Sequence, residues 1–75
     1  MYLSDIFNLA CTKLTPHMKE KGKDRTWLTR AQKYCEFLVK KTPLPENCHL
    51  DKDTKRLVES IVDEARDEID RKFST

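Results

Sequence analysis

Glycine is nearly absent from this 75-residue sequence, in which Gly22 is the only one. A nucleotide-binding loop of the G-x-x-x-x-G-K-S/T or G-x-G-x-x-G type needs two or three glycines, so neither motif is present. A β-sandwich or barrel also needs more glycine-bearing turns than this chain contains. No run of 18 apolar residues occurs, which excludes a membrane-spanning helix. We therefore expect one small domain with no bound cofactor and no membrane association.

Paired metal-ligand spacings are missing as well. Cys11, Cys35 and Cys48 form no C-x-x-C, and His17 and His49 form no H-x₃₋₅-H, so the sequence predicts no metal site. Cys48 beside His49 is the one candidate for thiol chemistry, but sequence neighbours rarely act as nucleophile and base for each other. We therefore predict that the protein is not an enzyme.

The cysteine count also bears on the compartment. Three is an odd number, and the sequence starts with neither a basic n-region nor an apolar h-region. Both features argue against a secreted disulfide framework. They predict reduced thiols and an intracellular location, cytoplasmic or nuclear.

What the chain does contain is amphipathic helical periodicity in three segments. The first segment covers residues 3–14, with Ser4 as a candidate N-cap. Pro16 disfavours helix at the preceding residue. Residues 16–21 are then expected to form a short extra helical turn that Gly22 closes in the left-handed conformation. A single kinked helix is the alternative.

The second and third segments have clearer apolar faces. The second runs from Thr26 to Lys41, capped by Asp24 or by Thr26 itself, and two prolines stop it. Its predicted core positions are Trp27, Leu28, Ala31, Tyr34, Cys35, Leu38 and Val39.

The third segment starts near Asp51 or Asp53. Its predicted buried positions are Leu57, Val58, Ile61, Val62, Ala65, Ile69 and Phe73. Three such helices bury their apolar faces best against one another, which predicts an all-α, three-helix bundle spanning residues 1–75 as one domain.

Charge is distributed unevenly along the chain. Nine Lys and Arg against four acids give residues 1–45 a net charge of +5. Six against nine give residues 46–75 a net charge of −3. Such asymmetry is typical of proteins that bind charged partners, although small helical proteins also use it for solubility.

One aromatic residue falls outside the predicted core stripes. On a helical wheel with Leu28 at zero, Phe37 lies at about 180°, opposite the core of the second segment. Its neighbours on that outer face are Arg30, Lys33, Lys40 and Lys41. Aromatic residues and arginine are enriched in protein interfaces, so this outer face, with its five residues, is the predicted partner-binding site. The alternative is that Phe37 packs under the loop of residues 42–50 or under residues 15–25.

The sequence therefore predicts a non-enzymatic interaction module that binds a protein partner. The alternative function is salt-dependent nucleic-acid binding, for which the additional candidate contacts are Lys19, Lys21, Lys23 and Arg25. The third segment carries an acidic face, which either keeps the protein soluble or docks on a basic partner. This face includes Glu59, Asp63, Asp67 and Asp70. The opposite charges of the two halves also permit self-association into a homodimer.

Overall fold

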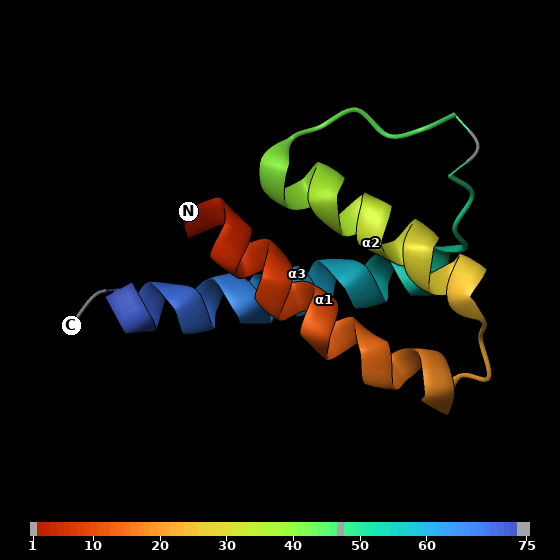
Figure 1. Cartoon of the computed structure of the whole chain (residues 1–75), viewed down its shortest axis with the longest axis horizontal. Coiled ribbons are helices and arrows are strands. Elements are labelled where there is room, and N and C mark those ends of the chain that lie inside the picture. The colour runs from red at the N-terminus through yellow and green to blue at the C-terminus, as the bar shows by residue number, and fades with distance from the viewer. Residues whose placement is uncertain (1, 47, 74–75) are drawn as a thin grey trace.

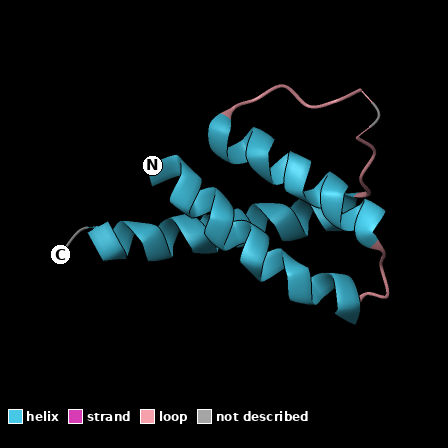
Figure 2. Ribbon diagram, viewed as in Figure 1, coloured by secondary structure: helices cyan, strands magenta, loops and turns pink. Residues whose placement is uncertain are grey.

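A computed structural model describes residues 2–46 and 48–73 of the chain. The elements are α1 (Tyr2–Glu20), α2 (Arg25–Lys40) and α3 (Lys52–Phe73), and each helix contacts the other two (Figure 1). Within the described residues there is no strand (Figure 2). No helix of this part of the chain is both long and apolar enough to span a membrane. The prediction of an all-α three-helix bundle is confirmed.

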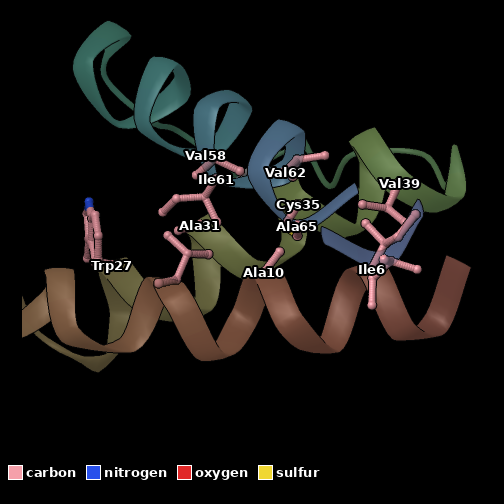
Figure 3. Close-up of a cluster of buried hydrophobic side chains, with 12 residues drawn as sticks. Ile6, Ala10, Trp27, Ala31, Cys35, Val39, Val58, Ile61, Val62 and Ala65 are labelled. Atoms are coloured by element: carbon pink, nitrogen blue, oxygen red, sulfur yellow. The ribbon is translucent and has the colours of Figure 1, made fainter. Parts of the chain in front are cut away.

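The core lies along the contact lines of the three helices and contains one fully buried alanine from each: Ala10, Ala31 and Ala65. Such small side chains let helix backbones approach closely. Trp27 closes one end of the cluster, and Ile6 and Val39 lie at the other (Figure 3). The buried apolar residues are Ile6, Ala10, Leu14, Trp27, Ala31, Cys35, Val39, Val58, Ile61, Val62, Ala65 and Ile69. Half-buried positions that pack against this core include four that we predicted to be buried: Leu28, Tyr34, Leu38 and Leu57.

The separate helical turn predicted for residues 16–21 is not formed. Instead α1 continues through Pro16 to Glu20, which is the alternative of one continuous helix. Proline removes one helical hydrogen bond, but Leu14 before it is fully buried and Met18 after it packs against the core. Tertiary packing therefore offsets the local cost. The predicted start of the first helix was also wrong, because Ser4 lies inside α1 rather than capping it.

The end of α1 follows the prediction for Gly22, which adopts a positive φ of 64°. The Lys23 amide donates to the Met18 carbonyl at 2.9 Å, and the Gly22 amide donates to the Lys19 carbonyl at 3.2 Å. These two hydrogen bonds form a Schellman motif, which satisfies carbonyls at the helix end. Immediately afterwards Asp24 caps α2, accepting a hydrogen bond from the Trp27 amide at 3.0 Å. The chain therefore turns between the two helices within a few residues.

Phe73 does not belong to the buried stripe of α3, contrary to our prediction. Its side chain is 62% exposed. The C-terminal turn of α3 extends beyond the start of α1 (Figure 1), and the Phe73 ring makes a tilted contact with the Tyr2 ring, at 6.2 Å between centroids. Periodicity places Phe73 on the correct side of α3, but the contact with Tyr2 leaves most of the ring exposed.

The C-terminal end of α2 is conformationally strained. Lys41, which we predicted to be the last helical residue, adopts φ 62° and ψ 25°, and its amide donates to the Phe37 carbonyl at 3.0 Å. A left-handed conformation costs an L-residue roughly 1 kcal/mol, whereas glycine adopts it freely.

We expect Lys41→Gly to raise the free energy of unfolding by about 1 kcal/mol, measured by urea denaturation with circular dichroism. Lys33→Gly, inside the same helix, should lower it by a similar amount. An unchanged or lower stability of Lys41→Gly would contradict the described cap.

Candidate functional site

The connection between α2 and α3 returns along the length of α2. From the end of α2 it runs back to the start of that helix, where α3 begins (Figure 1). Pro43 and Pro45 lack an amide hydrogen and favour extended backbone. The Cys48 thiol donates to the backbone carbonyl of Arg30, with Sγ 3.6 Å from the oxygen, and the Cys48 amide donates to the Pro45 carbonyl at 3.1 Å. The first bond links the connection to the outer side of α2, and the second lies within the connection.

A pocket of about 400 Å³ lies between this connection and α2. That volume falls within the usual range of ligand pockets. We call it the basic pocket, and its lining residues are Arg25, Thr26, Thr29, Arg30, Lys33, Pro45 and Cys48. The five residues from α2 lie on an arc of about 140°, opposite the arc that carries the buried residues. The lining therefore contains three cationic side chains, two hydroxyls and no carboxylate.

The cationic side chains of the basic pocket form no ion pair with another described residue. Ion pairs among the described residues join Lys13 to Glu68, His17 to Glu20, and Arg71 to Asp67, and none involves Arg25, Arg30 or Lys33. All three cationic residues are solvent-exposed. Because like charges in one pocket repel each other, this arrangement favours the entry of an anion.

A second hollow, of about 320 Å³, adjoins the basic pocket and shares Thr26 and Arg30 with it. Its other lining residues are Lys23, Asp24, Trp27, His49, Leu50 and Asp51. Two carboxylates lie in this lining, and both are already engaged: Asp24 caps α2, and Asp51 accepts a hydrogen bond from the Thr54 hydroxyl. The lining of the second hollow is thus of mixed charge, whereas the charged residues that line the basic pocket are all cationic.

The predicted partner-binding residues do not form one cluster. Arg30 and Lys33 line the basic pocket. Lys40 instead lies over the Phe7 ring of α1, with Nζ 4.8 Å from the centroid, and Lys41 caps α2. Phe37 is half-buried and stacks on Tyr34, with ring centroids 6.0 Å apart. Part of the Phe37 ring thus already packs within the protein.

The residues assigned to nucleic-acid binding lie at the other end of α2. Lys19, Lys21 and Lys23 are exposed around the turn between α1 and α2. Lys23 lines the second hollow, whereas Arg25 lines the basic pocket and joins Arg30 there. Basic side chains thus extend from the end of α1 along the outer side of α2.

Most of the acidic face of α3 takes part in contacts within the protein. Glu59 accepts a hydrogen bond from the Tyr34 hydroxyl at 3.2 Å, and burial together with this contact raises the pKa of Tyr34. Asp67 pairs with Arg71 at 2.9 Å, and Asp70 accepts a hydrogen bond from the Tyr2 hydroxyl. Asp63 is exposed. The contacts of this face are those expected of a stabilised, solvated helix surface.

The cysteines are distributed between core and surface. Cys35 is fully buried and Cys11 is half-buried across the interface of α1 and α2. A hydrogen bond between the two thiols lowers the pKa of Cys11, and the same bond together with burial raises the pKa of Cys35. Cys35 is therefore a protonated core residue. Within residues 2–46 and 48–73, no three His, Cys, Asp or Glu side chains are placed to hold a metal ion.

The sequence predicted Arg30 and Lys33 as members of the partner-binding site and Arg25 as an additional nucleic-acid contact. It assigned none of Thr26, Thr29 and Pro45 to a binding site, because the return path of the connection is not visible in local patterns. The helical spacing of residues 25, 29, 30 and 33 is the signal that could have grouped them.

Comparison with protein-family models, with curated proteins and with solved structures gives no significant match. Among the described residues, the basic pocket on the outer side of α2 is the feature on which a functional proposal can be based.

Proposed function

We propose that this chain is a non-enzymatic interaction module that binds an acidic segment of a protein partner along the outer side of α2. The observation that supports this proposal is the group of three cationic side chains, Arg25, Arg30 and Lys33, that line one pocket with no carboxylate among its lining residues. Guanidinium groups bind carboxylates through paired, charge-assisted hydrogen bonds. A local positive field also accelerates encounter with an acidic partner.

A binding role also fits the thiol at the site better than a catalytic one. The Cys48 thiol donates a hydrogen bond to the Arg30 carbonyl, and the neighbouring His49 lines the second hollow rather than the basic pocket. A cysteine nucleophile requires a base within hydrogen-bonding reach. In this arrangement Cys48 holds the connection against α2.

The proposal can be tested with a fluorescently labelled peptide rich in Glu and Asp. We expect saturable binding in an anisotropy titration at low ionic strength, weakening as salt is added. The double variant Arg30→Glu with Lys33→Glu should weaken binding at least tenfold, which corresponds to about 1.4 kcal/mol.

The matched control is Lys55→Glu with Arg56→Glu, which changes the net charge equally at two exposed positions near the start of α3. Acidic residues are favourable there, so the control should stay folded, as circular dichroism would verify for both variants. We expect it to weaken binding less than about threefold. Equal losses in the two variants, or no binding by the unaltered chain, would refute the proposed site.

A second candidate function, binding of single-stranded nucleic acid, is favoured by the basic side chains that continue from the pocket to Lys19, Lys21 and Lys23. The aromatic component supports it less, because Phe37 is half-buried and packs on Tyr34, which leaves less of its ring for a base to stack on. A labelled oligonucleotide in the same titration discriminates the two functions. Nucleic-acid binding predicts a log–log salt slope of about −0.7 per neutralised phosphate, and a loss of affinity in Lys19→Glu with Lys21→Glu.

A further inference from the structure

The two threonines of the basic pocket differ from several others in the chain. Thr12 and Thr15 donate their hydroxyls to the carbonyls of Asn8 and Cys11, and Thr54 bonds to Asp51. The hydroxyls of Thr26 and Thr29 have no hydrogen-bond partner among the described residues of the protein, and both residues are exposed. The pocket therefore presents two unused hydroxyl donors beside its cations.

The charge of the pocket exceeds what a single carboxylate would neutralise. Arg25, Arg30 and Lys33 together carry three positive charges, and no lining residue is acidic. A carboxylate brings one negative charge and two oxygens. A phosphate monoester brings a charge between about −1.5 and −2 at neutral pH and three strong acceptor oxygens.

The donor geometry also suits a phosphate group. Two guanidinium forks, one ammonium and two hydroxyls can donate many hydrogen bonds, and planar guanidinium groups match phosphate oxygens in pairs. The Cys48 thiol already donates a hydrogen bond to the Arg30 carbonyl, and Pro45 forms an apolar part of the pocket lining. The volume of about 400 Å³ leaves room for the side chain that carries the phosphate and for neighbouring residues of a peptide.

We propose that the basic pocket binds a phosphorylated serine or threonine within the acidic segment of the protein partner. This inference rests on the proposed function, since it names the group that the pocket recognises. Arg30 and Lys33 would bind the phosphate from one side of α2, Arg25 from the adjacent turn, and Thr26 and Thr29 would donate their free hydroxyls.

The test compares three ligands on the full chain at one ionic strength: an acidic peptide with one phosphoserine, the same peptide with serine, and inorganic phosphate as competitor. We expect the phosphopeptide to bind at least tenfold more tightly than the serine peptide. Inorganic phosphate should compete only at far higher concentration, because it lacks the peptide contacts. Equal affinities of the two peptides would overturn the phosphate inference and leave the proposed function standing, whereas failure of both peptides would overturn both.

Substitution of the threonines tests the pocket itself. Thr26→Val with Thr29→Val keeps the side-chain shape and removes both hydroxyls, so it should lower the preference for the phosphopeptide to about threefold or less while serine-peptide binding is retained. The matched control, Thr12→Val with Thr15→Val on α1, should keep the full preference. An unchanged preference in the pocket variant would overturn the assignment of these hydroxyls. Inorganic phosphate or an oligonucleotide that bound as tightly as the phosphopeptide would show that the ligand is not a phosphoprotein.

Discussion

Replacing Leu14 with alanine should lower the free energy of unfolding by about 2–5 kcal/mol. Leu14 is fully buried, and it lies in α1 two residues before Pro16, where a proline would ordinarily interrupt a helix. Its truncation leaves a cavity between the helices and weakens the packing that keeps residues 16–20 helical. A core of this size supplies a net stability of only about 3–5 kcal/mol, so the loss is a large part of the total. Thermal melting should show a decrease in Tm of roughly 10–30 °C.

Leu3→Ala is the matched control, because Leu3 lies in the same helix and is 44% exposed. The same chemical change should shift the free energy of unfolding by no more than about 0.5 kcal/mol there. Circular dichroism with urea compares the two variants directly. If Leu14→Ala cost less than about 1 kcal/mol, Leu14 would not occupy the described core position.

Features of the fold that depend on local chemistry were predictable from the sequence. The apolar stripes define the three helices, Asp24 caps α2 as one of two predicted caps, and Gly22 adopts the left-handed conformation that ends α1. Each of these depends on residues within one or two turns of helix. Local patterns carry that information because the competing conformations differ mainly in hydrogen bonds near the residue itself.

Features that depend on contacts between distant segments were not predictable in the same way. Pro16 should interrupt a helix by its own chemistry, but burial of Leu14 and packing of Met18 outweigh that cost. Phe73 has the correct helical spacing for burial, but exposure depends on where α1 begins relative to the end of α3. Both outcomes follow from packing between helices rather than from sequence neighbours.

The candidate site shows the same division. Helical spacing places Arg30 and Lys33 on the outer side of α2, as the sequence predicts, but the pocket exists because the connection folds back along that side. Pro45 and Cys48, which form its other wall, are more than ten residues away from the α2 positions they face. The contact of Lys40 with Phe7 likewise joins two helices, so the wheel of α2 alone could not separate Lys40 from Lys33.

The second prediction with a large effect concerns the polar contact that joins α2 to α3. The Trp27 indole donates through Nε1 to the buried Thr54 hydroxyl at 3.0 Å, and that hydroxyl in turn donates to the Asp51 carboxylate. Thr54→Val keeps the shape of the side chain but leaves the indole N–H without its acceptor. We expect the free energy of unfolding to fall by about 1–3 kcal/mol, measured by urea denaturation through the fluorescence of Trp27.

Thr54→Ser is the control, because it keeps the hydroxyl and removes one methyl group at a cost of about 0.8 kcal/mol. If the valine variant were as stable as the unaltered chain, the hydrogen bond would contribute nothing to joining the helices. The comparison therefore separates the contribution of the hydroxyl from that of packing.

The same contact predicts a dependence on pH. The hydrogen bond from Thr54 holds the pKa of Asp51 below its usual value. A carboxylate with a depressed pKa in the folded state contributes stability above its unfolded pKa of about 3.9, and this contribution is lost as the pH falls through the folded value. The stability difference between the unaltered chain and Thr54→Val should therefore narrow as the pH falls below about 4. A difference that stayed constant down to pH 2 would mean that Asp51 does not share in the contact, and that Thr54 acts on Trp27 alone.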